Sequence, residues 1–356
     1  MRIAFVALET ALHADTAANR RVKGVAEHLA ERGHDVVLFC AKWWTGKKAE
    51  WEHRGVVYRG LVGDVDSSRK FRYTLPMAVR KFDADVVHVA GSPPKQVSSA
   101  SKAARLSDAP LVTEWYGDVA SYGRRHRKAL KKSDVVVTPS EMVRTTVWEH
   151  GAAEGDVEVV PNSIDFESVE SVEPVEAGDV VYARRLDDGA NLESLLLAMA
   201  EHRDVDWSTV VVGDGPRREA YERQAKDLRI EDRVTWLGEC DREQRLAVYR
   251  GAQVFAQTAR RCRFPTELLW GVAAGCIGIV EYHAESSAHE LLARRDSDFE
   301  RGFRTTSEQE LTEAIDEAMG MEHRTVDERF AEYDHTPVLE RYLQTYRDEL
   351  DSADLF

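Results

Sequence analysis

The sequence predicts two α/β domains in tandem, each with a doubly wound parallel sheet and helices on both of its faces. One observation is that short β-branched runs alternate with amphipathic segments along both halves of the chain. Runs that are apolar throughout and separated by helices indicate parallel strands that are buried on both faces. The other is that 356 residues exceed one typical domain, while a hydrophobic share of 43% can supply two cores.

The first half of the chain carries this alternation as far as residue 165. Residues 3–8 are predicted to be a strand, and residues 18–32 an amphipathic helix that Gly33 ends. Further strands are expected at 35–40, 56–62, 84–90, 109–115 and 133–140. We therefore expect an N-terminal Rossmann-like domain over residues 1–165.

The second half repeats the pattern after an acidic segment, 166–178, which contains Pro174 and Gly178 and is the predicted interdomain linker. Strands are expected at 179–185, 208–215, 233–238, 254–259 and 276–282, with helices at 191–202, 216–228, 242–252 and 266–275. A second Rossmann-like domain is predicted over 179–335, and residues 336–356 are predicted to be a helix that packs back toward the N-terminal domain. Open α/β sheets bind ligands at the carboxyl ends of their strands, so we expect the active site in a cleft that both domains face.

Charge is unevenly distributed between the two halves. Residues 1–165 hold 25 Lys and Arg against 21 Asp and Glu, whereas residues 166–356 hold 23 against 42. A split of this size indicates domains with different partners, and the total charge of −15 argues against nucleic-acid binding. Abundant acids with only 12 lysines resemble the surface of a halophilic protein from a high-salt cytoplasm.

The four cysteines are far apart and show no metal-ligand spacing. We therefore expect reduced thiols, no metal site and a cytoplasmic protein. The apolar run at the start meets Glu9 after a few residues, so we interpret it as a buried strand rather than a signal peptide. No apolar run reaches the roughly 18 residues that a membrane span requires.

A glycine turn is expected after the second strand of the C-terminal domain. Gly213 and Gly215 flank Asp214, and Pro216 suits the first position of a helix, where its missing N–H costs nothing. Such a turn would leave backbone N–H groups free at the positive end of a helix, which suits a phosphate. The alternative is a tight turn that binds no ligand.

Five collinear segments, which cover most of the chain, resemble glycosyltransferase family four, of GT-B fold. They are LAERGHDVVLF (29–39), VVVTPSEMVRTTVWEHGA (135–152), VEVVPNSIDFESV (157–169), the run from 182 to 255, and FPTELLWGVAAGCIGIV (264–280). The resemblance implies a donor sugar linked to UDP or GDP, transferred with retention of anomeric configuration. The nucleotide-sugar would be a substrate, and the resemblance implies no metal or cofactor. The donor would bind the second domain and the acceptor the first.

The resemblance also suggests donor-binding residues. Arg185 matches an arginine that grips the donor diphosphate, and a guanidinium suits this because it bonds phosphate in a bidentate fork. Gly238 and Cys240 lie in a loop similar to the one whose backbone contacts the nucleobase. The other expected donor-site residues lie in the glycine turn and in the segment before and within the 266–275 helix: Gly213, Asp214, Gly215, Phe264, Pro265, Thr266, Glu267 and Trp270.

Three positions depart from the family's pattern. Ala190 stands where the family has a lysine for the diphosphate, and Cys262 and Trp270 stand where it has two glutamates. Glu267 shares a helix face with Trp270 and is the carboxylate expected to reach the donor ribose. The alternative is an exposed glutamate that the helix dipole favours.

Arg261 and Arg263 stand out in an acidic domain, beside the expected phosphate loop. We expect them to replace the missing lysine at the diphosphate. The alternative is that they pair with the acidic surface around them.

Tyr116 and Asp118 follow a predicted strand of the first domain, where the family often has a histidine that contacts the transferred sugar. With Arg185 they are the candidate catalytic residues, and the alternative is that they only shape the loop. Two basic segments, 67–82 and 121–134, lie in the same domain. The candidate acceptor or membrane patch is Arg124, Arg125, Arg127, Lys128, Lys131 and Lys132.

A basic surface with apolar neighbours indicates docking on an anionic membrane or on a lipid-phosphate acceptor. The alternative is a solvated helix face. We therefore expect a cytoplasmic protein, peripheral on the inner face of the membrane, that moves a hexose-type sugar to a glycan or lipid-linked acceptor. Because three donor-site positions are changed, the alternative function is a GT-B protein without catalysis that serves as a binding or partner subunit.

Overall fold

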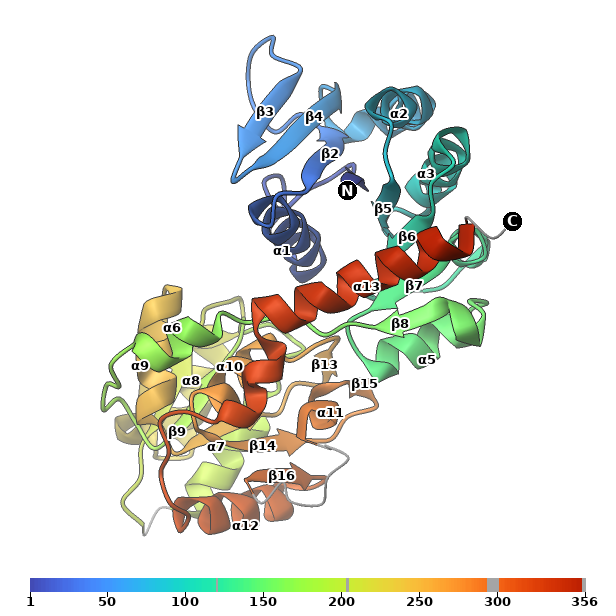
Figure 1. Ribbon diagram of the computed structural model, residues 1–356. Helices are drawn as coiled ribbons and strands as arrows, with labels where there is room; N and C mark the ends of the chain where they lie inside the picture. Colours follow the sequence, from blue (N-terminus) through green and yellow to red (C-terminus); the bar gives the residue numbers. More distant parts are fainter. Residues whose placement is uncertain (120, 203–204, 293–300, 354–356) are drawn as a thin grey trace. The chain divides into compact units, whose positions relative to one another are not determined.

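A computed structural model describes residues 1–119, 121–202, 205–292 and 301–353 and divides the chain into two compact units (Figure 1). The first unit comprises Met1–Asn162 and Thr336–Phe356, and the second comprises Ser163–His335. Each unit has a parallel sheet with helices on both faces, so the predicted fold class is confirmed. The first unit ends slightly before the predicted boundary at residue 165.

The first unit contains one sheet, with strand order β3-β4-β2-β1-β5-β6-β7-β8 in the described residues. Its strands are β1 (Arg2–Val6), β2 (Asp35–Ala41), β3 (Glu50–His53), β4 (Val56–Val62), β5 (Val86–Ala90), β6 (Leu111–Glu114), β7 (Val135–Thr138) and β8 (Val157–Val159). All neighbours pair in parallel except β3, which pairs antiparallel with β4. The sequence analysis did not predict β3, because its exposed Glu-Trp-Glu run carries no apolar strand signal.

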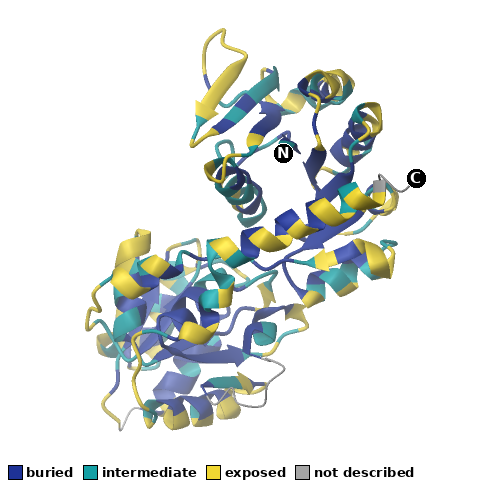
Figure 2. Cartoon of the chain, viewed as in Figure 1, coloured by how far each residue is buried: buried dark blue, intermediate teal, exposed yellow. Residues whose placement is uncertain are grey.

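Helices cover both faces of this sheet. They are α1 (Ala17–Glu31), α2 (Ser68–Phe82), α3 (Pro94–Ser107), α4 (Arg124–Leu130), α5 (Glu141–Glu149) and α13 (His335–Ala353). Helices α2 to α5 pack on one face through residues such as Phe71 and Val97, whereas α1 and α13 cover the other through residues such as Val22 and Leu339. Figure 2 shows these inward faces as buried stripes on helices whose outer sides are exposed.

A buried ion pair joins α1, β6 and α13. The Arg21 Nε atom donates to Glu114 Oε1 over 2.7 Å, and the Tyr342 hydroxyl donates to Glu114 Oε2 over 2.7 Å. Burial alone would raise the pKa of Glu114, but Arg21 and His88 outweigh it and lower that pKa to about 2. The C-terminal helix is therefore attached to the first unit by a charged network as well as by apolar packing.

The second unit has a six-stranded parallel sheet in the described residues, with order β11-β10-β9-β12-β14-β16. Its strands are β9 (Val180–Ala183), β10 (Thr209–Val212), β11 (Val234–Gly238), β12 (Val254–Gln257), β14 (Ile277–Glu281) and β16 (Gly302–Thr305), and β13 (Arg261–Cys262) pairs separately with β15 (Glu285–Ser286). Its helices are α6 (Phe166–Ser171), α7 (Leu192–Glu201), α8 (Arg218–Asp227), α9 (Arg242–Gly251), α10 (Thr266–Ala273), α11 (Ala288–Leu292) and α12 (Glu308–Met319). None of the described helices in either unit is both long and apolar enough to cross a membrane.

The predicted linker 166–178 is wrong in its first part, which forms α6. Asp165 caps this helix by accepting a hydrogen bond from the Ser168 amide, and Phe166 and Val169 are buried in the core of the second unit. Farther on, the Val175 amide donates to the Ala247 carbonyl of α9 over 2.9 Å. An apolar pair spaced one helical turn apart was sufficient to build a short helix in an otherwise acidic segment.

We predict that Glu114→Ala lowers the free energy of unfolding by about 3–5 kcal/mol, because it leaves the Arg21 guanidinium buried without a counter-charge. Urea denaturation followed by circular dichroism measures the change. The double variant Arg21→Met/Glu114→Gln removes both charges and should recover much of the loss. Glu52→Ala, on the exposed strand β3, is the control and should change stability by less than about 0.5 kcal/mol. A loss below about 1 kcal/mol for Glu114→Ala would contradict this account.

We also predict acid sensitivity from the same carboxylate. The folded pKa of Glu114, about 2, lies below the ordinary value of 4.5, so the ion pair stabilises the fold fully above about pH 4.5. That contribution should be lost progressively as the pH falls from 4.5 toward 2. Urea midpoints measured between pH 7 and pH 3 should decline less steeply in the double variant than in the unaltered chain.

Candidate functional site

Three loops follow the neighbouring strands β9, β10 and β11 at the carboxyl edge of the second unit's sheet. Backbone hydrogen bonds join the first two loops. The Arg184 amide donates to the Val212 carbonyl over 3.0 Å, and the Leu186 amide donates to the Asp214 carbonyl over 2.9 Å. The loop after β9 is therefore held along the glycine turn 213–215.

The glycines of that turn are required by close packing. Gly213 has a φ of +117°, and a Cβ atom there would overlap the Arg184 carbonyl. A Cβ on Gly215 would overlap the Leu186 carbonyl in the same way. The backbone that precedes and follows Arg185 is thereby fixed, while the Arg185 side chain is exposed and forms no ion pair among the described residues.

The two glycine amides of the turn, which were predicted to be free, both donate hydrogen bonds within the protein. The Gly213 amide donates to the Gly238 carbonyl over 2.7 Å, which joins the loop after β11 to the turn. The Gly215 amide donates to the carboxylate of Asp214 over 2.6 Å. Pro216 does not occupy the first helical position either, because it precedes Arg217, the N-cap residue of α8. The expectation that both amides stay free for a phosphate is therefore wrong for this structure.

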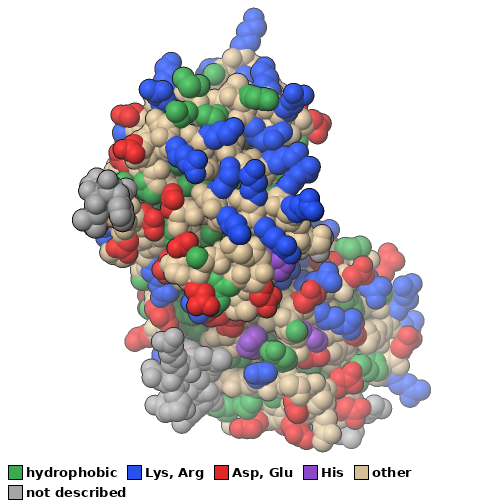
Figure 3. All heavy atoms as spheres, turned by 90° about the vertical axis from the view of Figure 1, so that its right-hand side faces the viewer, with side chains coloured by type: hydrophobic (Ala, Val, Ile, Leu, Met, Phe, Trp, Pro, Cys, Tyr) green, Lys and Arg blue, Asp and Glu red, His purple; other side chains and the backbone are tan. Residues whose placement is uncertain are grey.

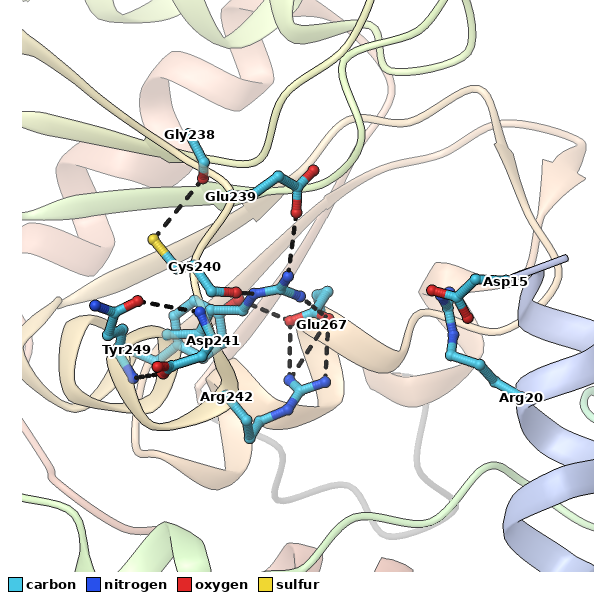
Figure 4. Close-up of polar contacts among 11 residues, drawn as sticks. Asp15, Arg20, Gly238, Glu239, Cys240, Asp241, Arg242, Tyr249 and Glu267 are labelled. Atoms are coloured by element: carbon cyan, nitrogen blue, oxygen red, sulfur yellow. Dashed lines mark hydrogen bonds and ion pairs between the residues drawn. The ribbon is translucent and has the colours of Figure 1, made fainter. Parts of the chain in front are cut away.

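Glu267 lies in an ion-pair cluster between α9 and α10 (Figure 4). The Arg245 Nη1 atom lies 2.9 Å from Oε1, the Arg242 Nη1 atom 3.2 Å from Oε2, and the Tyr249 hydroxyl donates to Oε2 over 2.8 Å. The Arg242 guanidinium also lies 4.5 Å above the ring of Trp270, which is buried. Glu267 and Trp270 therefore lie on the same face of α10, as their spacing predicts. The Glu267 carboxylate, however, is already paired with two arginines of α9.

The same cluster fixes the loop that holds Gly238 and Cys240. The Arg245 Nε atom donates to the Cys240 carbonyl over 2.9 Å, and its Nη2 atom lies 3.4 Å from Glu239. Burial raises the pKa of the Cys240 thiol, whose sulfur contacts the Gly238 carbonyl. The loop expected to face the nucleobase is thus positioned through its backbone, while its exposed Glu239 side chain pairs with Arg245.

Two arginines before α10, Arg260 and Arg261, are paired with acids rather than left available. The Arg261 Nε atom lies 2.7 Å from Glu285, and Arg260 lies 3.2 Å from Glu193. The Arg263 carbonyl accepts a hydrogen bond from the Ser287 hydroxyl. For Arg261 the structure therefore favours the alternative of pairing with the acidic surface.

The remaining predicted donor residues lie in and beside α10. Phe264 is half-buried against the core, Pro265 precedes the helix, and Thr266 is its first residue. Cys262 lies in β13. Ala190 is fully buried and its carbonyl accepts a hydrogen bond from Tyr182, so this position offers a ligand no charge.

A buried polar cluster that the sequence analysis missed lies at the carboxyl ends of β9, β12 and β14. The Asn191 amide nitrogen donates to the Thr258 carbonyl over 2.9 Å, to Ser194 over 3.0 Å and to Glu281 over 3.0 Å. Burial raises the pKa of Glu281, which lies 3.4 Å from His283. The sequence signal was a carboxylate at the end of an apolar strand run, but its partners lie far away in the chain.

Tyr116 and Asp118 line a small cavity of about 50 Å³ in the first unit. The cavity lies at the carboxyl ends of β5 and β6, beside the start of α1. Tyr116 is buried, whereas Asp118 is exposed. The polar part of the lining further includes Asn19, Ser92 and Glu114. The structure thus brings the two predicted residues together in the first unit, whereas Arg185 belongs to the second unit.

The candidate basic patch lies on and after α4. Its members are exposed except for Lys132, which is half-buried: Arg124, Arg125, Arg127, Lys128, Lys131 and Lys132. None of them forms an ion pair with another residue in the described part of the chain.

Among all the residues that the structure describes, no group of three His, Cys, Asp or Glu side chains is arranged to hold a metal ion.

Family models match the two halves of the chain in succession. The model for Glycosyltransferase Family 4 matches residues 18–168, and the model for Glycosyl transferases group 1 matches residues 163–334. The chain belongs to the GT-B glycosyltransferases. For this glycosyltransferase, the boundary between the two models falls where the structure divides the chain. No curated protein matches the sequence.

Solved structures of other glycosyltransferases share the fold over their whole length. Sucrose-phosphate synthase from Thermosynechococcus elongatus is 18% identical with a TM-score of 0.76, and the match covers 99% of this chain and 100% of that one. A glycosyltransferase from Rickettsia africae is 15% identical, with a TM-score of 0.79 and 98% of both chains covered. HepE from Anabaena, solved in complex with UDP, is 15% identical with a TM-score of 0.76, over 98% and 100%. At these identities the comparison establishes the fold alone.

We predict that Gly213→Ala lowers the free energy of unfolding of this glycosyltransferase by about 1–3 kcal/mol, because alanine is strained at the positive φ and its Cβ overlaps the Arg184 carbonyl. Thermal and urea unfolding measure the loss. Gly320→Ala is a matched control in the same unit, where φ is negative and the nearest atom lies 3.5 Å from the added Cβ. Equal stability of the two variants would show that the turn is not closely packed.

Proposed function

We propose that the chain transfers a hexose-type sugar from a UDP- or GDP-linked donor to a glycan or lipid-linked acceptor, with retention of anomeric configuration. The observation that carries the proposal is Arg185: an exposed guanidinium without an ion pair in the described residues, on a loop that the glycine turn holds rigid. A guanidinium placed in this way is suited to bind a diphosphate and to stabilise the negative charge that develops on it as the sugar leaves.

The comparisons support a nucleotide-sugar as the donor. HepE from Anabaena has been solved with UDP and with UDP-glucose, and the group 1 model covers the unit that holds Arg185. Retention is what the resemblance to family four implies. The nucleotide-sugar acts as a substrate in this proposal, which invokes no metal or other cofactor.

We propose a cytoplasmic location, because the four cysteines are far apart and are expected to be reduced thiols.

The acceptor side is proposed to be the first-unit cavity that Tyr116 and Asp118 line. The cavity volume of about 50 Å³ exceeds the roughly 10–15 Å³ that one water molecule needs, so polar groups of a ligand can enter it. An exposed carboxylate at its rim would accept hydrogen bonds from sugar hydroxyls. We propose these two residues as contacts of the acceptor or the transferred sugar.

A second candidate function is a GT-B protein without catalysis that serves as a binding or partner subunit. The observation that favours it is the donor-side chemistry: Ala190 is buried and uncharged, Trp270 is buried, and Glu267 is held by Arg242 and Arg245. A donor ribose that bonded Glu267 would have to share its oxygens with these arginines. Donor binding therefore separates the two functions.

We predict that isothermal titration detects binding of a UDP- or GDP-sugar and that Arg185→Ala weakens it at least about tenfold, since a hydrogen bond to a charged group contributes about 1.5–3 kcal/mol. Arg223→Ala, an exposed arginine of α8, is the matched control and should leave the dissociation constant unchanged. If neither nucleotide-sugar binds, the transferase proposal fails and the non-catalytic function is favoured. If one binds, product analysis by NMR tests the anomeric configuration.

A further inference from the structure

Three helices of the first unit contain no acidic residue, although the chain carries a net charge of −15. Helix α2 has five Lys and Arg residues, α3 has three and α4 has four. Elsewhere in the chain, acids outnumber bases. A surface of one sign on an otherwise acidic protein produces a local positive potential that the overall charge opposes.

These three helices are neighbours on the same face of the sheet. Helix α2 packs against α3, and α3 packs against α4. Figure 3 shows many Lys and Arg side chains over the first unit on the face turned to the viewer, with few acids among them. The sequence placed the two basic segments 67–82 and 121–134 far apart, and α3 joins them by adding Lys95, Lys102 and Arg105. We name the outer side of α2, α3 and α4 the basic surface.

Apolar side chains protrude from the basic surface. Tyr73 and Met77 of α2 are 75% and 61% exposed, and Leu106 of α3 is 45% exposed. The sequence predicts apolar neighbours for the basic residues of segment 67–82, but two of its apolar residues, Phe71 and Leu75, are fully buried in the core. Helical spacing places Tyr73 and Met77 on the outer side, one turn apart.

The positive charges of the basic surface are not neutralised by neighbours. None of the Lys and Arg residues of α2, α3 or α4 forms an ion pair within the ranges that the structure describes. Burial and the nearby Lys128, Arg105 and Lys102 lower the pKa of Lys132. Like charges from α3 and α4 therefore act on one another, as expected of a surface that lacks counter-charges of its own.

We propose that the basic surface docks the protein on an anionic lipid bilayer. Lys and Arg would contact lipid phosphates, while Tyr73, Met77 and Leu106 enter the boundary between headgroups and acyl chains. A soluble polyanion would satisfy the charges but would offer no apolar layer for these three side chains. The proposal goes beyond the proposed function, because it concerns the first unit and holds whichever donor the second unit binds.

The contribution of the Lys and Arg charges to membrane partitioning can be estimated. Each Lys or Arg near an anionic membrane raises partitioning by a factor of about five, which corresponds to about 1 kcal/mol. Screening reduces this factor because the Debye length is only about 8 Å at physiological ionic strength. Removing four charges should therefore weaken binding by at least about 20-fold at low salt.

The experiment is sedimentation of the full chain with vesicles of phosphatidylcholine alone or mixed with phosphatidylglycerol. The unaltered chain should bind only the mixed vesicles, and less as sodium chloride is raised. The variant Lys70→Gln/Lys81→Gln/Lys102→Gln/Lys128→Gln should lose at least about 20-fold in partitioning. The control Lys47→Gln/Lys48→Gln/Arg223→Gln/Lys226→Gln removes the same charge from exposed sites elsewhere and should bind nearly as the unaltered chain does.

A second variant tests the apolar contribution. Tyr73→Ser/Met77→Ser keeps every charge and should weaken vesicle binding several-fold, whereas Leu237→Ser, an exposed leucine of the second unit, should not. Circular dichroism spectra and titration with UDP- and GDP-sugars are measured on all variants. Neither the spectrum nor the sugar-nucleotide affinity should change, which separates this proposal from the proposed function.

Three results would overturn the proposal. The first is equal binding to phosphatidylcholine vesicles, and the second is equal binding by the two quadruple variants. The third is binding to heparin with none to the mixed vesicles, which would assign the basic surface to a soluble polyanion.

Discussion

The structure of the second unit depends on one steric constraint, the contact between the turn 213–215 and the backbone that flanks Arg185. Neither Gly213 nor Gly215 leaves room for a Cβ atom, so two loops from adjacent strands lie closer than side chains would permit. A further hydrogen bond from the Gly213 amide to Gly238 adds the third loop. Three carboxyl-end loops are thereby joined into one rigid edge, from which the Arg185 side chain extends.

Charge pairing completes this edge on its other side. Arg245 connects Glu267 of α10 to the loop at Cys240, and Arg242 connects Glu267 to the ring of Trp270. A carboxylate held by two arginines and a tyrosine is oriented, but its oxygens are already engaged. The edge therefore combines a rigid backbone and one available guanidinium with a carboxylate that a ligand would have to share.

The two units use charge in opposite ways. In the first, a buried pair of Arg21 and Glu114 attaches the C-terminal helix, while the outer side of α2, α3 and α4 is left without counter-charges. In the second, exposed arginines such as Arg261 are paired with the acids that surround them. Several arginines of the acidic unit are thus paired with acids, whereas the lysines and arginines of the basic surface form no ion pair in the described residues.

The sequence by itself determined the two-domain α/β fold, most strands of the two main sheets and the glycine turn, because these depend on periodicity and on residues that are neighbours in the chain. Among the elements it missed are β3, whose exposed residues carry no apolar signal, α6 in an acidic segment, and the short strands β8, β13, β15 and β16. Only the tertiary structure decided that Glu267 pairs with Arg242 and Arg245, that Asn191 meets Glu281, and that α3 joins two distant basic segments. These outcomes depend on contacts between residues far apart in sequence, which local periodicity does not encode.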